Sequence, residues 1–215
     1  MCGRFSLDTT KAEIAKEFRC DRVAFKGSSF NVAPSQNITA VINGGDNNEA
    51  VMMRWGLIPR WVKSLDSFRG NLINARVETA DEKPSFKDAF FKRPCLIPVT
   101  GFYEWDKTKQ PYYFHVEKGL FALAGIWETR ISSETEEKLL SCTILTTQAK
   151  GSITDVHHRM PIVITPEYYD LWLDSVDERK KLIEALPEAK LKMYPVSKTV
   201  NSPKNNSPDC IEPTS

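Results

Sequence analysis

The chain has 215 residues, of which 41% are apolar and 27% are charged, and its formal net charge is +1. This composition is typical of one folded domain and excludes a largely disordered chain, a collagen-like repeat and a small disulfide scaffold. The near-zero net charge also excludes a protein that holds nucleic acid by bulk positive charge, although a local basic surface remains compatible with it.

Signals for a membrane, a disulfide framework or a metal are absent from the sequence. There is no run of about 18 apolar residues, and the N-terminal segment has no apolar signal core, so we expect an intracellular protein without membrane contact. The five cysteines are widely spaced and form no CxxC pair, which predicts free thiols. The three histidines have no zinc-ligand spacing, so we expect no metal.

The first half of the chain predicts one helix, one hairpin and a long loop. Thr10 and Glu13 form a capping box that opens a helix ending near Phe18. Strands at 38–42 and 50–55 flank a turn at 43–46 and are expected to form a hairpin. Residues 56–75 are predicted to be a loop, and loops of this length in compact domains are often functional. A short helix follows at 85–91.

Strands dominate the second half. We expect them at 95–99, 102–105, 112–116, 120–127, 139–146, 160–164 and 191–196. Thr165 is expected to cap a helix that has Pro166 at its first position and ends near Leu173, and a further helix spans 177–186. The strands follow one another without a βαβ rhythm, so we predict an α+β fold with a mostly antiparallel, barrel-like twisted sheet and peripheral helices. With no linker visible, a single domain covers residues 1–215.

Cys2 carries the most informative chemistry. Aminopeptidases remove an initiator methionine when the second residue is small, so the mature chain is expected to begin with a cysteine that has a free α-amine beside its thiol. The usual pKa values of these groups are about 7.7–8.0 and about 8.5, so both nucleophilic forms are accessible near neutral pH. The amine can serve as base for the thiol, or it can condense with an aldehyde before the thiol closes a thiazolidine ring. A cysteine at this position by chance is the alternative.

Three further segments hold candidate residues. Glu104 lies between Tyr103 and Trp105 and, if desolvated, could act as a general acid; otherwise it faces water. His157 and His158 are expected to point to opposite faces of an extended segment, so one of them at most faces a site. Asn74 and Arg76, two residues apart, could hold a phosphate or a sugar; the alternative is a capped turn that leads into a strand.

A basic stretch is the last feature. Residues 54–93 contain nine Lys and Arg against five Asp and Glu, and Trp55 and Trp61 lie among them. Such a pattern suits stacking on unpaired bases, although a solvated surface and core tryptophans also account for it.

Taken in order, the motifs resemble one family, the SOS response-associated peptidase family, which includes the abasic-site processing proteins. The motifs are Met1–Arg4, Asn31–Pro34, Arg54–Pro59, Asn74–Thr79, Gly101–Trp105, His157–Pro161, Pro195–Ser197 and Val200–Asn201. They span nearly the whole chain. The resemblance therefore implies that the tail at 201–215 is extended but partly packed.

The resemblance implies a monomer that senses abasic sites in single-stranded DNA and crosslinks to them through Cys2. By position, Glu104 would help to open the sugar ring, Asn74 would position Cys2 or the sugar, and His157 would be the family's histidine. Arg4, Arg76 and Arg159 would hold phosphates, and the residues near the DNA path would be Asn31, Pro34, Trp61 and Thr146. No metal or organic cofactor is needed. The expected location is the cytoplasm, at the nucleoid, in a bacterium, or the nucleus in a eukaryote.

Three alternatives remain at this point. An N-terminal-nucleophile glutaminase can also begin with Met-Cys-Gly, but no second synthetase-sized domain accompanies it here. A peptidase, with an activity that could be confined to Met1 removal, is the second alternative. A single-strand binding module without chemistry is the third, and it predicts that Cys2 is dispensable. Lyase activity toward the abasic site could accompany the trapping reaction.

Overall fold

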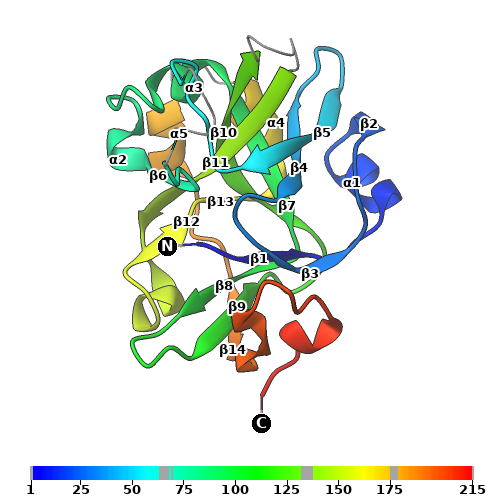
Figure 1. The fold of residues 1–215 in the computed structure, drawn as a ribbon, viewed down its shortest axis with the longest axis vertical. Helices are drawn as coiled ribbons and strands as arrows, with labels where there is room; N and C mark the ends of the chain where they lie inside the picture. Colours follow the sequence, from blue (N-terminus) through cyan, green and yellow to red (C-terminus); the bar gives the residue numbers. More distant parts are fainter. Residues whose placement is uncertain (1, 63–67, 69, 132–137, 175–178, 215) are drawn as a thin grey trace.

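Fourteen strands and five short α-helices are found in the described residues, 2–62, 68, 70–131, 138–174 and 179–214, of the computed structural model (Figure 1). The strands are β1 (Phe5–Leu7), β2 (Cys20–Val23), β3 (Ser29–Val32), β4 (Asn37–Asn43), β5 (Asn48–Trp55), β6 (Asn74–Arg76), β7 (Pro94–Val99), β8 (Gly101–Trp105), β9 (Pro111–His115), β10 (Phe121–Ile131), β11 (Lys138–Gln148), β12 (Arg159–Pro161), β13 (Val163–Ile164) and β14 (Lys192–Pro195). The α-helices are α1 (Lys11–Glu17), α2 (Val77–Ala80), α3 (Lys87–Lys92), α4 (Tyr169–Asp174) and α5 (Arg179–Ala185). Four 3-10 helices span Gly151–Asp155, Pro166–Tyr168, Lys198–Asn201 and Pro208–Cys210.

Five of the strands close into a barrel. Antiparallel pairs run from β11 through β10, β7 and β4 to β5, and a parallel pair between β5 and β11 completes the ring. Figure 1 shows α1, α2 and α3 outside this barrel. The predicted α+β fold with a mostly antiparallel, barrel-like sheet and peripheral helices is therefore confirmed.

A second, five-stranded antiparallel sheet packs below the barrel in the view of Figure 1, in the order β14-β9-β8-β1-β3. The ring of Phe5 on β1 lies 5.1 Å from that of Trp55 on β5, and both side chains are buried, so this aromatic pair joins the two sheets. At Gly56, a φ of +125° ends β5 in a conformation that side-chain-bearing residues rarely adopt. The loop predicted at 56–75 is confirmed up to Ile73 in the described residues, but its end is wrong, because Asn74 and Ala75 already belong to β6; residues 63–67 and 69 lie outside the described part.

Local sequence signals predict their elements well. The capping box is confirmed: Glu13 N donates to Thr10 Oγ1 at 3.2 Å, and Thr10 N donates to the Glu13 carboxylate at 2.9 Å. The 38–55 hairpin is also confirmed, with Val41 opposite Ala50. The expected helix at 85–91 is the shorter α3. The start of the helix expected from 177 lies outside the described residues, and α5 covers most of its remainder.

Two predictions near Pro161 and Thr165 are wrong in detail. The single strand expected at 160–164 is divided into β12, which pairs with β11, and β13, which pairs with β10. Thr165 makes no side-chain capping bond, and Pro166 opens a 3-10 turn that leads into α4. The chain changes partner strand at Ile162, whose N donates to Leu145 O and whose O accepts from Ala124 N.

The C-terminal segment, residues 196–214, lies along the lower sheet. Val200 and Cys210 are buried against Tyr103 and Tyr113. Figure 1 shows this segment at the opposite end of the molecule from the tips of β4 and β5. No α-helix in the described part of the chain is long and apolar enough to cross a membrane.

Candidate active site

Cys2 lies just before β1, and its side chain is buried. β1 runs antiparallel to β8, and Tyr103 N donates to Arg4 O at 3.0 Å, so the first residues of the chain follow the end of β8. Asn74, the first residue of β6, donates from Nδ2 to Cys2 O at 2.8 Å. The Cys2 side chain is 0% exposed. Burial, followed by the negative charge of Glu104, raises the pKa of the Cys2 thiol well above its usual value, so the thiol is protonated at neutral pH.

Glu104 lies on β8, inside the protein, with 2% of its surface exposed. Burial raises the pKa of its carboxyl to about 7, and the positive charge of the amino terminus acts in the opposite direction. The neighbouring Tyr103 is fully buried, and Trp105 is half-buried and donates from Nε1 to Asn201 Oδ1 at 2.7 Å. A carboxyl with this pKa exists in both protonation states at pH 7, so it can donate a proton and later take one back.

The two histidines lie in a turn before β12, and their rings stack with centroids 4.4 Å apart. The expectation that they point to opposite faces of an extended segment is therefore wrong, because the turn brings the rings together. Nδ1 of His157 accepts a hydrogen bond from Arg159 N at 2.9 Å and lies 3.1 Å from Arg159 O. Burial, followed by the positive charge of the amino terminus, lowers the pKa of His157, so its ring is mostly neutral at pH 7.

Arg159 and Arg76, both predicted to hold phosphates, differ in their surroundings. The Arg159 side chain is buried, and its guanidinium forms a two-pronged pair with the Glu78 carboxylate at 2.6 and 2.9 Å. It also donates to Thr146 O at 2.7 Å, and Thr146 itself is buried on β11. Arg76 is exposed on β6, and its side chain has no hydrogen bond or ion pair with any described residue. Only Arg76 therefore presents its cation directly to solvent.

Arg4 and Asn31 are bound within the fold. Arg4 Nη1 donates to Asn31 Oδ1 and to Val200 O, both at 2.7 Å. Asn31 is 1% exposed, and its Nδ2 lies within hydrogen-bonding distance of the carbonyl oxygens of Val200, Ser202 and Asn205. These two side chains connect the beginning of the chain to the C-terminal segment, so their predicted contacts with DNA stay predictions.

Pro34 and Trp61 lie on loops. Pro34 is half-buried in the turn between β3 and β4, where Ser35 N donates to Trp55 O at 2.8 Å. Trp61 is 60% exposed, and its ring meets that of Phe68 edge-on at 6.5 Å. Its loop is held by an ion pair of 3.0 Å between Arg60 and the buried Glu128. In the described residues, neither Pro34 nor Trp61 has a hydrogen bond to Cys2, Asn74, Glu104 or His157.

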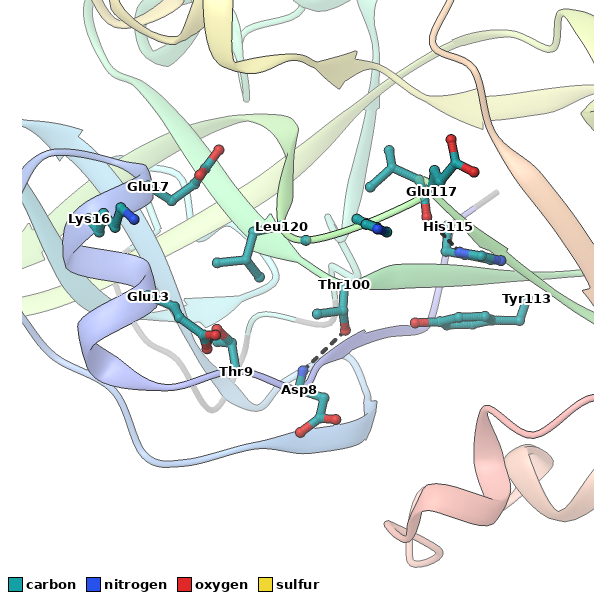
Figure 2. A pocket seen from close by; sticks show the side chains of 13 residues that line it. Asp8, Thr9, Glu13, Lys16, Glu17, Thr100, Tyr113, His115, Glu117 and Leu120 are labelled. Carbon is teal, nitrogen blue, oxygen red and sulfur yellow. Dashed lines mark hydrogen bonds between the residues drawn. The ribbon is translucent and has the colours of Figure 1, made fainter.

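A cavity of about 450 Å³ lies between α1 and the β9–β10 turn, away from these residues (Figure 2). Figure 2 shows Asp8, whose N donates to Thr100 Oγ1 at 3.1 Å, on one side of it. Two of its carboxylates serve the fold, since Glu13 caps α1 and Glu117 pairs with Lys192 at 2.9 Å. None of the predicted site residues lines this cavity.

Four predicted residues converge on the start of the chain. Asn74 contacts Cys2 directly, the charge of Glu104 acts on the Cys2 thiol, and the charge of the amino terminus acts on both Glu104 and His157. The arrangement offers a thiol, a carboxyl near its pKa and a neutral imidazole. It suits nucleophilic addition with proton transfer. Glu78, which holds Arg159, was not predicted as a site residue, although it lies in the motif that contains Asn74 and Arg76.

Comparison with known proteins adds a family. The model of the family described as SOS response associated peptidase (SRAP) matches residues 1–203. The chain is 41% identical to the protein named abasic site processing protein YoqW of Bacillus subtilis, with 99% of both chains covered. It is 31% identical to the one named abasic site processing protein HMCES of Pongo abelii, over 86% of this chain and 65% of the relative.

A solved structure shares the fold. The X-ray crystal structure of a protein from Bacteroides thetaiotaomicron superposes with a TM-score of 0.87 at 26% sequence identity, covering 99% of this chain and 100% of that one. The barrel and the lower sheet are therefore an arrangement that distant sequences also adopt.

Proposed function

Because this chain belongs to the SOS response-associated peptidase family, we propose that it processes abasic sites in single-stranded DNA and crosslinks to them through Cys2 after Met1 is removed. The names of its relatives support the substrate class. The observation that carries the proposal is the placement of Cys2 against Asn74 and within the electrostatic reach of Glu104.

The reaction begins with the sugar. A closed abasic deoxyribose is a hemiacetal. Its ring oxygen gains a proton, its C1′ hydroxyl loses one, and the bond between the ring oxygen and C1′ breaks, leaving an aldehyde at C1′ and a hydroxyl at C4′. Glu104 is the proposed proton donor, since burial keeps its carboxyl partly protonated at neutral pH. Its position on β8, a strand paired with β1, supports this role, because removal of Met1 would free the Cys2 amine just before β1.

Two bonds then form at C1′. The Cys2 amine adds to the aldehyde and water leaves, which gives a Schiff base. The thiol adds across the C=N bond: sulfur bonds to C1′, the nitrogen gains a proton, and a thiazolidine ring closes. The raised pKa of the buried thiol favours this order, because the thiol is not a thiolate that could attack first. Ring closure suppresses the β-elimination that a Schiff base permits, so trapping competes with lyase activity and shields the lesion.

The surroundings suit an unpaired strand. Arg76 is exposed two residues from Asn74 and can meet a phosphate, and the exposed ring of Trp61 can stack on a base. An opposite strand would block entry of the sugar to the buried Cys2. Arg4 and Arg159 reach phosphates only if they exchange partners inside the chain, and Asn31, Pro34 and Thr146 act by shaping that region. The reaction needs no metal or organic cofactor, and we propose that the protein acts as a monomer.

Intact-mass analysis with an abasic single-stranded oligonucleotide tests the proposal. The expected product has the mass of the protein without Met1 plus the oligonucleotide, minus one water. Cys2→Ser keeps the amine but provides a poor second nucleophile, so it should leave little heat-stable adduct. Met1 retained in a stable crosslink, or equally durable crosslinking by Cys2→Ser, would falsify the thiazolidine mechanism.

The same sample separates the remaining activities. Undamaged DNA of the same sequence should give no covalent product, and free glutamine should not be hydrolysed. A thiol adduct or peptide cleavage without any abasic site would favour an N-terminal-nucleophile hydrolase instead. Strand-cleavage products would measure lyase activity, and loss of Met1 from purified precursor would measure self-processing.

A further inference from the structure

His157 is held by the main chain of Arg159. Arg159 N donates to Nδ1 of the ring at 2.9 Å, and Arg159 O lies 3.1 Å from the same nitrogen. A nitrogen that accepts a hydrogen bond carries no proton, so a neutral ring in this position has its proton on Nε2. Only a ring protonated at Nδ1 could donate to the carbonyl instead.

The Arg159 main chain is in turn fixed by its own side chain. β12 has only three residues, and Arg159 stands at its first position, opposite Gln148 of β11. Its buried guanidinium bonds both oxygens of Glu78 and the carbonyl of Thr146. A two-pronged, charge-assisted pair of this kind is among the strongest side-chain contacts and defines orientation as well as distance.

Glu78 lies on α2, which follows β6 without a break. Residues 74–78 therefore contact the site twice: Asn74 bonds the carbonyl of Cys2, and Glu78 bonds the arginine whose main chain holds His157. β6 itself pairs with β11, with Arg76 opposite Thr146. The nucleophile and the imidazole are thus supported from one short segment.

We propose that Glu78 is a positioning residue: by holding Arg159, it keeps His157 in the tautomer that has its proton on Nε2 and can only donate a hydrogen bond from that atom. The role of this tautomer in the reaction rests on the proposed function. The neutral ring then stabilises an oxygen of the opened sugar as a donor, and Glu104 is left as the group that exchanges protons.

The charged groups around the ring fit this role. His158 stacks on it. Burial is the main cause of the lowered pKa of His157, and the charges of the amino terminus, His158 and Arg159 act in the same direction, while the hydrogen bond with the Arg159 main chain raises the pKa. The carboxylate of Glu78 is engaged by the Arg159 guanidinium, and this hydrogen bond is the main cause of the lowered pKa of Glu78. Glu78 therefore acts on His157 through the geometry of Arg159.

The test is a nitrogen-15 NMR experiment on DNA-free protein labelled at its histidine rings, at pH 8. The signal that disappears in His157→Gln identifies the residue. In the wild type, His157 should show one tautomer, with the proton on Nε2. Glu78→Gln should give a mixture of tautomers. Glu82→Gln, which removes an exposed carboxylate with no bond to Arg159, should match the wild type.

Kinetics provide the second measurement. With saturating abasic oligonucleotide, Glu78→Gln should crosslink about tenfold more slowly, as expected for the loss of a charge-assisted hydrogen bond, while its affinity for undamaged single strands does not fall. Glu78→Asp should recover part of the crosslinking rate. If Glu78→Gln does not fold, Glu78→Asp takes its place in both the NMR and the kinetic measurement. A proton on Nδ1 in the wild type, or an unchanged tautomer in both Glu78 variants, overturns the proposal. Because the spectra need no DNA, they decide it even if abasic DNA gives no crosslink.

Discussion

The burial of Glu104 is the feature on which the proposed chemistry depends most. Its carboxyl lies on a central strand of the lower sheet, and desolvation raises its pKa to about 7. The same negative charge, when present, adds to the effect of burial on the Cys2 thiol. The two groups therefore control each other: the thiol becomes a better nucleophile when Glu104 is protonated or accepts its proton.

Glu104→Gln should slow crosslinking to natural abasic sites by about 100- to 10,000-fold, the range of general acid–base catalysis. The amide keeps the shape of the side chain but cannot give a proton to the ring oxygen, so DNA affinity should be nearly unchanged. Single-turnover rates measured from pH 5 to 9 should bend near pH 7 in the wild type and lose that bend in the variant. Wild-type rates in the variant would mean that another group is the acid.

Sequence patterns locate the chemical groups of the site but not all of their partners. Cys2, Asn74, Glu104 and His157 stand in recognisable motifs, and the structure brings them to one place. The partners of Arg4 are different, because Asn31 is 27 residues away and Val200 is 196 residues away along the chain. No local pattern predicts such contacts. The sequence alone therefore does not distinguish an arginine that binds groups inside the fold from one that is free to bind a phosphate.

Elements were predictable where their signals are local. The capping box of α1 and the β4–β5 hairpin each depend on residues a few positions apart. Sequence patterns do not predict β1, β2, β3 or β6, since each has only three or four residues and finds some or all of its partners in distant parts of the chain. β6 is an instructive case: Asn74–Arg76 becomes a strand because β11 lies beside it, with Ile144 opposite Asn74.

The C-terminal segment also acts as an element of the fold, although its composition resembles that of a flexible tail. Asn206 Oδ1 accepts from Phe30 N at 2.7 Å and from Asn31 N at 3.2 Å, and so covers the outer edge of β3. An unpaired edge strand is a site for aggregation, and this side chain satisfies two of its donors. The segment also contacts the start of the chain, because Val200 O accepts a hydrogen bond from Arg4, which is two residues after Cys2.

Asn206→Ala should therefore lower stability and loosen the start of the chain. Leaving backbone donors without a partner costs about 1–3 kcal/mol, which corresponds to a fall of several degrees in Tm for a chain of this size. Asn206→Asp keeps the acceptor oxygen and should remain close to the wild type. Thermal unfolding of the three proteins measures the effect, and an alanine variant as stable as the wild type would show that the segment contributes little.

The charge of the whole molecule determines how it can hold DNA. With a net charge of +1, attraction must come from local contacts, and Arg76 is the predicted phosphate-binding arginine that faces solvent without a partner in the described residues. Affinity for single strands should fall with salt by a slope of about −0.7 per phosphate contacted. Arg76→Ala should flatten this slope by about one contact, and Lys118→Ala, remote on the β9–β10 turn, should not change it. Equal slopes for Arg76→Ala and the wild type would remove Arg76 from the DNA path.

The burial of Glu104 should lower the free energy of unfolding of the whole protein when the carboxyl is ionised. The pKa of its carboxyl rises from an ordinary 4.5 to about 7 on folding, so the folded state binds a proton more tightly than the unfolded state. Stability that depends on this group is therefore greatest at low pH and declines as the pH rises between these two values. Above pH 7 the loss reaches its full size, about 3 kcal/mol if the shift acts alone.

Glu104→Gln imitates the protonated form at every pH, so the variant that destroys activity should be the more stable protein at pH 8. The difference in Tm should be several degrees there and should shrink toward zero as the pH falls to 5. Unfolding curves of the wild type, Glu104→Gln and the exposed control Glu82→Gln, recorded across this range, measure it. A wild type more stable than Glu104→Gln at pH 8 would mean that partners of the carboxylate outweigh its desolvation, and Glu104 would then be a poor proton donor at neutral pH.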